Sequence, residues 1–550
     1  MHRERKYKRY SRRNPTYMPG QRRAGSLALI ALAVSTTAVG VMQICAAEPT
    51  PSQQVSATAP MNCAALMSRQ FAHTTLASAA VVSAGAFKSP SPELAGPPAD
   101  FSKLPAFCRV VGSIHPRSDS DIRFELWLPI YGWNGKFAQT GNGGAAGSIV
   151  YSSLADPLGR GYAVANTDTG HQGGMGDFSW ALEHPAKLVD YADRAVHELT
   201  IVGKAITAAA YGSPPVKSFW VGCSTGGRQG LMEAERYPQD YDAIVAGAPA
   251  SNWVPLMSLA ISIQRNLGGH DGLGFDKLAV LQNAAIAKCS GADGAKDRII
   301  GEPSQCTFDP GTLQCRSGVT KECLTAPEVA AARRIYAGVV TKSGQVLIPG
   351  TGPGSEPLWA AYASPQFSIG TSYFRNVVIQ DPKWDPSAFN VDVDVAMAQK
   401  ADGGATAAMN PDLRSFIGHG GKLITYHGTT DGLIPYGNSL NYYRSVVSKL
   451  GQAKAADSVR FFPVSGMGHC SGGEGAFVVD WLGALEHWVN TGKAPDTLQG
   501  AHPVMPPGPP GMPQPMSTGF TRPICAYPSS PKYRGTGDAR DAKNFSCTSP

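Results

Sequence analysis

The sequence predicts an α/β fold, in which helices cover both faces of a mostly parallel sheet and a large insertion divides the sheet-forming part of the chain. Short segments that alternate like strands, such as 123–128, 136–140 and 161–166, are followed by a stretch of helical periodicity at 186–211. A glycine-flanked turn then joins an apolar strand-like segment to a helix-like one. The regular alternation stops near residue 251 and resumes at 422, which indicates the insertion.

The glycine-flanked turn carries the first candidate for chemistry. Gly222, Ser224 and Gly226 fit the G-x-S-x-G nucleophile elbow of α/β-hydrolases, with the strand ending at Gly222 and a helix opening after Gly227. Such a turn lifts the serine oxygen above the sheet, and the N–H groups that begin the helix face the negative charge that develops there. We therefore predict an α/β-hydrolase core with a large inserted lid domain, and Ser224 as its nucleophile.

A serine nucleophile needs a base, and the base needs an acid to orient it. In α/β-hydrolases the acid precedes the histidine in the chain, and Asp431 and His469 follow two successive predicted strands in that order. Asp480 comes after the histidine on a predicted helix, which makes it a poor third member. His427 and His487 are interpreted as strand-end and helix-face residues.

Two cysteines support this choice of histidine. Cys223 directly precedes Ser224, and Cys470 directly follows His469. If Ser224 and His469 lie within hydrogen-bonding reach, their neighbours fall inside the ~4.4–6.8 Å Cα separation of a disulfide. The expected bridge would fasten the nucleophile to its base.

The N-terminus predicts export. Its first 23 residues hold nine Lys or Arg and one Glu, an apolar stretch runs from Leu27 to Ile44, and Cys45-Ala46-Ala47 resembles a cleavage site. Residues 1–47 are therefore expected to be a signal peptide, with Met18 as a second possible start and a membrane anchor as the alternative. We therefore expect a periplasmic or secreted protein that has no stable membrane span once the signal peptide is cleaved.

Charge and cysteine content agree with that compartment. Of the 48 Lys and Arg and 41 Asp and Glu, removal of the leader leaves 39 basic and 40 acidic residues, so nothing indicates a nucleic-acid partner. Of 11 cysteines, ten remain after Cys45 leaves, which suggests five disulfides in an oxidising compartment. Short separations favour Cys289–Cys306, Cys315–Cys323 and Cys525–Cys547.

The mature chain divides into four predicted parts. They are a first core segment at 48–250, a lid at 251–408, a second core segment at 409–497, and a proline-rich connector with a disulfide-closed tail at 498–550. The sequence of the predicted lid shows no regular helical or strand pattern and contains many Pro, Gly and Asp residues. The oligomeric state has no signature in the sequence.

The chain resembles the tannase/feruloyl esterase family, which also contains the hydrolase of mono(2-hydroxyethyl) terephthalate. The resemblance rests on Cys-Ser-Thr-Gly-Gly-Arg-Gln-Gly at 223–230, His-Gly-Thr-Thr-Asp-Gly-Leu-Ile-Pro at 427–435, Gly-Met-Gly-His-Cys at 466–470 and the cysteine-containing tail. It implies a Ser224–Asp431–His469 triad, a lid that shapes the acyl pocket, and a Cys63–Cys108 bridge besides the four pairings above.

The resemblance implies two further sites. The oxyanion hole would use the N–H groups of Thr225 and of Gly144, in the Gly143–Gly144 loop. The segment from Asp293 to Ile299 resembles the family's structural calcium loop, which carboxylates and carbonyl oxygens can form around a hard cation. The implied ligand positions are Ser290, Asp293, Ala295, Asp297 and Ile299. Family members usually have Asp where this chain has Ser290, so calcium should bind more weakly, and a solvated acidic turn is the alternative.

These features predict an exported serine esterase without a catalytic cofactor, which cleaves a small aromatic ester such as a feruloyl or galloyl ester through an acyl-enzyme. A terephthalate monoester hydrolase, a non-catalytic binding protein on the same fold and a peptidase are the alternatives. Four lid aromatics could stack on the acyl group or simply pack in the lid core: Trp359, Phe367, Tyr373 and Phe374.

Overall fold

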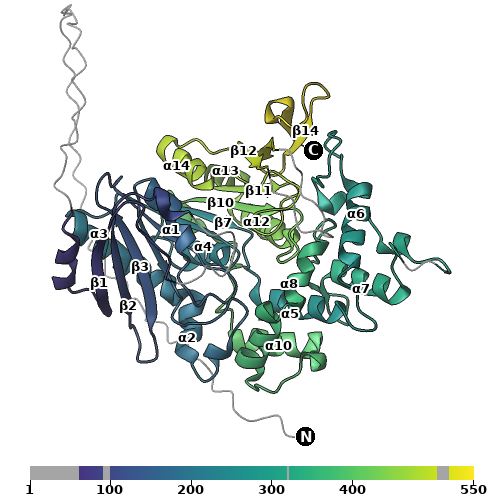
Figure 1. Ribbon diagram of the computed structural model, residues 1–550, viewed down its shortest axis with the longest axis horizontal. Coiled ribbons are helices and arrows are strands. Elements are labelled where there is room, and N and C mark those ends of the chain that lie inside the picture. The colour runs from purple at the N-terminus through teal and green to yellow at the C-terminus, as the bar shows by residue number, and fades with distance from the viewer. Residues whose placement is uncertain (1–60, 91–99, 319–320, 505–518, 550) are drawn as a thin grey trace, which may run out of the picture. The chain divides into compact units, whose positions relative to one another are not determined.

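A computed structural model describes residues 61–90, 100–318, 321–504 and 519–549 (Figure 1). The predicted leader and most of the proline-rich connector lie outside these residues. Among the described residues, no helix combines the length and the apolar composition needed to cross a bilayer.

The centre of the fold is a nine-stranded sheet with the order β1-β2-β3-β5-β4-β6-β7-β10-β11. Strands β1, β2, β3 and β5 pair antiparallel, whereas all pairs from β5 onward to β11 are parallel. The bounds are β1 Thr74–Val82, β2 Phe107–Ile114, β3 Ile122–Pro129, β4 Lys136–Thr140, β5 Ala163–Thr167, β6 Lys217–Cys223, β7 Ala243–Gly247, β10 Lys422–Gly428 and β11 Val459–Val464.

Helices cover both faces because successive strand residues point to opposite sides. On β6, Trp220 packs with α3, α4 and α12, whereas its neighbour Phe219 packs with α1 and α14. The helices of this part are α1 Tyr151–Gly159, α2 Pro185–Val189, α3 Ala195–Tyr211, α4 Thr225–Arg236, α12 Tyr436–Leu450, α13 Gln452–Ser458 and α14 Trp481–Thr491. The predicted α/β-hydrolase fold is therefore confirmed, although α4 begins two residues before Gly227.

The early start of α4 depends on close backbone contacts. A Cβ on Gly226 would lie 2.9 Å from the Cα of Gly141, and one on Gly222 would lie 2.6 Å from the carbonyl carbon of Gly226. Glycines are therefore compatible with this helix because its first turn packs directly against neighbouring backbone. Because glycine has a low helix propensity, the sequence-based prediction places the start of α4 after these glycines, too far along the chain.

The chain between the paired strands β7 and β10 forms the insertion, and it is largely helical rather than irregular. Its longest helix, α5, is buried around nearly its whole circumference, so it lacks the one-sided apolar pattern that reveals a surface helix. The insertion contains α5 Trp253–Asn266, α6 Lys277–Cys289, α7 Ala326–Ala337, β8 Val339–Val340, β9 Val346–Ile348, α8 Ala360–Ala363, α9 Ile369–Tyr373, α10 Val391–Asp402 and α11 Arg414–Gly418.

The tail forms two small antiparallel pairs, β12 with β13 and β14 with β15. Their bounds are β12 Thr497–His502, β13 Phe520–Cys525, β14 Ser530–Tyr533 and β15 Phe545–Thr548. All ten cysteines of the described residues are bonded in the five expected pairs: Cys63–Cys108, Cys223–Cys470, Cys289–Cys306, Cys315–Cys323 and Cys525–Cys547.

Candidate active site

Ser224 occupies a strained turn between β6 and α4. Its φ of 63° and ψ of −123° are rare for a residue with a side chain and cost on the order of 1–3 kcal/mol. Hydrogen bonds hold the turn: the Ser224 N–H donates to the Gly247 carbonyl at 2.9 Å, and the Ser224 carbonyl accepts from Arg228 at 3.0 Å and Ala250 at 3.1 Å. The backbone is thus fixed on both sides of a serine that is only partly buried.

Asp431 and His469 meet at the same edge of the sheet. Asp431 follows β10, His469 follows β11, and Nδ1 of His469 lies 2.8 Å from Oδ2 of Asp431. The other carboxylate oxygen, Oδ1, accepts from the N–H groups of Leu433 at 2.8 Å and Ile434 at 2.9 Å. The carboxylate of Asp431 therefore orients the ring of His469, and backbone N–H groups of the loop after β10 hold that carboxylate in place.

His427 is a second histidine on the same carboxylate. Its Nε2 lies 3.2 Å from Oδ2 of Asp431 and 2.9 Å from the carbonyl of Ile434, and both partners accept, so Nε2 carries a proton. Its Nδ1 contacts Ser439 Oγ at 2.8 Å. His427 does end a strand as predicted, but the sequence interpretation missed this contact, for which the four-residue spacing to Asp431 was the available signal.

The two histidines determine the charge of the acid. Burial by itself would raise the pKa of Asp431, but the charges and hydrogen bonds of His469 and His427 outweigh burial and hold that pKa well below its ordinary value. Asp431 is 1% exposed, so it is a buried carboxylate that remains ionised.

The disulfide Cys223–Cys470 links the serine turn to the histidine loop. Its Cα atoms lie 6.0 Å apart, although 247 positions separate them in the sequence. Since each cysteine is next to a candidate catalytic residue, the bond restricts how far Ser224 and His469 can separate.

Thr225 and Gly144 also come together. The Thr225 hydroxyl donates to the Gly144 carbonyl at 2.6 Å, and the Tyr191 hydroxyl donates to the same carbonyl at 3.2 Å. Gly144 has a φ of 52°, and a Cβ there would clash with the Met175 carbonyl. The loop that would supply the second oxyanion donor is thus anchored beside the first residue of α4.

Three of the four lid aromatics lie in the hydrophobic core of the insertion. Trp359, Tyr373 and Phe374 are at most 1% exposed, which agrees with the packing role given as the alternative. Phe367 is partly buried, and its backbone lies against Gly176, next to the Met175 that contacts the Gly144 loop. Of the four, Phe367 is therefore the most exposed, although it also packs against this core and stacks on Tyr362.

A cavity of about 230 Å³ lies between the insertion and the histidine loop. Thr430 and Gly468, the neighbours of Asp431 and His469, line it together with Arg298 and Leu358. Ser224 and His469 themselves are absent from its lining, so we do not assign this cavity to the acyl group.

The loop closed by Cys289–Cys306 has the oxygen ligands that calcium prefers, but fewer than the family pattern. Asp293 and Asp297 are close enough for their charges to interact, and burial followed by that repulsion raises the pKa of Asp297. One oxygen of Asp297 already accepts from Arg522 at 2.6 Å. The loop therefore fits a hard cation as a site with reduced negative charge, since Ser290 adds none.

Comparison with known proteins agrees with the fold and identifies the family. The family model described as Tannase and feruloyl esterase matches residues 108–548. A probable feruloyl esterase B-1 of Aspergillus flavus is 35% identical over 462 residues, covering 80% of this chain and 86% of the relative. An uncharacterized esterase of Xanthomonas campestris pv. campestris is 34% identical over 541 residues, covering 90% and 92%.

A solved structure gives the same result. The crystal structure of feruloyl esterase B from Aspergillus oryzae superimposes with a TM-score of 0.80 at 31% sequence identity, over 88% of this chain and 99% of that one. The chain therefore belongs to the tannase and feruloyl esterase family of carboxylic ester hydrolases.

Proposed function

We propose that the protein is an exported serine esterase that hydrolyses esters of phenolic acids. The observation that carries the proposal is the Asp431–His469 hydrogen bond on a loop that a disulfide joins to the strained turn of Ser224. Acyl transfer to a serine requires a serine on an exposed turn, an oriented imidazole and an ionised carboxylate, and Ser224, His469 and Asp431 supply these groups.

In the proposed reaction, Nε2 of His469 takes the proton of the Ser224 hydroxyl as its oxygen attacks the ester carbonyl. The negative charge moves to the carbonyl oxygen, where the N–H groups of Thr225 and Gly144 would stabilise it. Collapse of the intermediate expels the alcohol, which receives the proton from His469 and leaves an acyl-enzyme. Water repeats the sequence to release the acid. Asp431 stabilises the imidazolium at both stages.

The phenolic acid is proposed from the relatives' names, because the named relatives include probable and crystallised feruloyl esterases. Phe367 is the lid residue that we propose for contact with the aromatic ring. A terephthalate monoester is the second candidate. A binding protein without activity is disfavoured because all three triad positions are filled, and a peptidase because the relatives are esterases.

Export is supported by the five disulfides, since such bonds persist in oxidising compartments. We propose a periplasmic or extracellular location after removal of residues 1–47. N-terminal sequencing of the protein recovered outside the cytoplasm should begin near Glu48, and a mature protein that retains the leader would contradict this part.

We also propose that the loop of Asp293 and Asp297 binds a structural calcium ion, with Ala295 and Ile299 as carbonyl ligands. The ion would balance the repulsion between the two carboxylates and stiffen the disulfide-closed loop. It would take no part in the ester chemistry, which the residues of the triad perform.

The test of the function is a panel of methyl ferulate, methyl gallate, chlorogenate and mono(2-hydroxyethyl) terephthalate, assayed side by side with Ser224→Ala as the control. The highest kcat/KM should belong to one of the phenolic esters. A preference for the terephthalate ester would favour the second candidate, and no turnover of any ester by the folded protein would favour the binding protein.

A further inference from the structure

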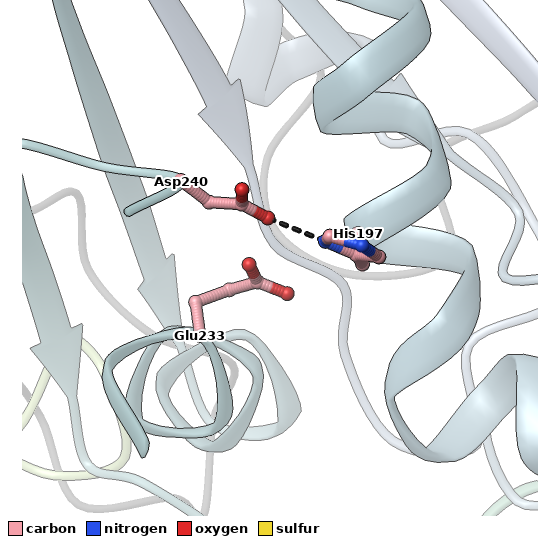
Figure 2. A group of neighbouring side chains, drawn as sticks. All are labelled: His197, Glu233 and Asp240. Atoms are coloured by element: carbon pink, nitrogen blue, oxygen red, sulfur yellow. Dashed lines mark hydrogen bonds and ion pairs between the residues drawn. The ribbon is translucent and has the colours of Figure 1, made fainter. Parts of the chain in front are cut away.

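A second group of polar side chains lies away from the serine turn, between helices α3 and α4 and the loop before β7. His197 belongs to α3, Glu233 to α4, and Asp240 to that loop (Figure 2). One nitrogen or oxygen atom from each of the three lies within 4.8 Å of the other two. Figure 2 shows the three side chains pointing toward one another.

No hydrogen-bond donor among the described residues explains the position of the Glu233 carboxylate. It is 1% exposed, and neither of its carboxylate oxygens has a hydrogen-bond partner among the described residues. A buried carboxylate without partners costs several kcal/mol if it stays ionised. Its side chain nevertheless turns toward His197 and Asp240, which are already joined through Nδ1 and Oδ2 at 2.6 Å.

We propose that His197, Glu233 and Asp240 form a binding site for a divalent transition-metal ion, with zinc as the best match. One imidazole nitrogen and two carboxylates are the ligand types that zinc takes, whereas calcium prefers a shell made of oxygen. Three protein ligands leave a fourth tetrahedral position for water.

The size of the group suits such an ion. Some point lies within about 2.8 Å of all three donors when none of them is more than 4.8 Å from another, and zinc takes nitrogen and carboxylate ligands at ~2.0–2.2 Å. Shifts below ~1 Å per side chain therefore complete the site. The ion would replace the proton between His197 and Asp240, whose donor atoms would move apart to about 3.3 Å.

The surroundings hold the ligands and leave an entrance. The ring of His197 stacks on Tyr237, with centroids 3.8 Å apart and planes 11° from parallel. Lys204 donates to the backbone carbonyl of Asp240, which fixes the loop. The side chains of His197 and Asp240 are 26% and 16% exposed, so an ion can enter from solvent and reach the buried Glu233.

Without an ion, Glu233 would have to keep its proton. Burial, followed by the nearby carboxylates of Asp240 and Asp193, raises the pKa of Glu233 well above its ordinary value, with Lys204 opposing. A neutral Glu233 sharing its proton with Asp240 is thus the competing explanation of the same geometry, and the experiment must separate the two.

The experiment is a calorimetric titration of the mature protein with zinc after treatment with a chelator. The wild-type protein should bind one equivalent of zinc. The variants Glu233→Gln and His197→Asn should bind zinc at least tenfold more weakly. His184→Asn is the matched control, because His184 also pairs with an aspartate, Asp119 at 3.1 Å, but on the exposed surface. Asp293→Asn controls for the calcium loop. Both controls should retain the equivalent.

Two further measurements keep the test decisive. Cobalt in place of zinc should give visible absorption bands with the wild-type protein. His197→Asn, a change at a partly exposed side chain, should remove these bands. Zinc should raise the melting temperature of wild type and leave that of Glu233→Gln unchanged. Equal zinc binding by wild type and both ligand variants, or no bound equivalent in wild type, would overturn the metal site in favour of the shared proton.

Discussion

Nε2 of His427 lies 3.2 Å from Oδ2 of Asp431, the same oxygen that His469 reaches through Nδ1 at 2.8 Å. The acid of the proposed triad therefore serves two imidazoles. His427 is fully buried, and its other nitrogen is held by Ser439, so it cannot rotate freely. We interpret it as a positioning residue, because it acts on the reaction through Asp431.

Replacing His427 should lower kcat more than it changes KM. His427→Asn removes an N–H from an ionised carboxylate, an interaction of about 1.5–3 kcal/mol, so a loss of about tenfold or more in kcat is expected. Ser439→Ala is the control, since it removes only the Nδ1 partner and should have a small effect. Equal kcat values for wild type and His427→Asn would contradict the positioning role.

The Cys223–Cys470 bridge should affect catalysis as well as stability. A disulfide typically contributes ~2–4 kcal/mol to folding, but this one also limits the separation of Ser224 and His469, and about 1 Å of misplacement can cost on the order of a hundredfold in rate. We expect the double variant Cys223→Ala/Cys470→Ala to have a lower kcat than wild type, even when it is assayed well below its melting temperature.

The bridge Cys315–Cys323 supplies the comparison, because it closes a short loop of eight positions in the insertion. Cys315→Ala/Cys323→Ala should lower the melting temperature and leave kcat nearly unchanged. If the 223/470 variant, folded by circular dichroism, kept the wild-type kcat, the bridge would be only a structural crosslink.

Calcium should change stability more than chemistry. Added calcium is expected to raise the melting temperature slightly over that in a chelator, with little change in kcat. Ser290→Asp restores the charge that the family pattern has at this position, so its calcium-dependent rise should be larger than that of wild type. Identical melting temperatures for both proteins in calcium and in chelator would mean that the loop takes no ion.

Asp168 should make stability fall as the pH rises. Burial, opposed by the N–H groups of Gly170 and Arg123, raises the pKa of Asp168 to about 8, compared with about 3.9 in an unfolded chain. Between these values the folded protein holds a proton that the unfolded chain has lost. The free energy of unfolding therefore decreases by up to ~1.4 kcal/mol per pH unit through this one group.

Asp168→Asn should flatten that dependence, because the amide keeps an oxygen for the two N–H groups and cannot ionise. Urea unfolding midpoints of wild type and variant between pH 5 and 8 provide the measurement, with the exposed Asp271→Asn as control. Parallel curves for wild type and Asp168→Asn would show that Asp168 ionises normally.

The sequence predicted the parts of this protein that depend on local pattern. Strand β4 and the turn at Ser224 are visible in short segments, and the cysteines beside Ser224 and His469 identify a contact across 247 positions. The edge strand β1 is rich in Ala, Ser and Thr with an irregular burial pattern, so it gives no comparable signal. The helix α5 shows no helical periodicity in its apolar residues, because nearly its whole circumference is buried.

Other features depend on how distant segments meet. The contact of His427 with Asp431 requires the loop after β10 to curl back, and the meeting of His197 with Glu233 requires α3 and α4 to cover the same face of the sheet. The four-residue spacing from His427 to Asp431 is a signal for the first contact, whereas no spacing identifies the second. Whether an aromatic of the insertion lines a pocket or fills a core, as Trp359 does, likewise depends on packing in three dimensions.

The most direct test of the proposed mechanism is to label the serine. A fluorophosphonate reacts with an activated serine when the hydroxyl oxygen displaces fluoride from phosphorus, and mass spectrometry of the digested protein locates the adduct. We expect one adduct, on the peptide containing Ser224, with complete loss of methyl ferulate hydrolysis, and no adduct on Ser224→Ala. An adduct at another residue, or a Ser224→Ala protein with activity within tenfold of wild type, would contradict the mechanism.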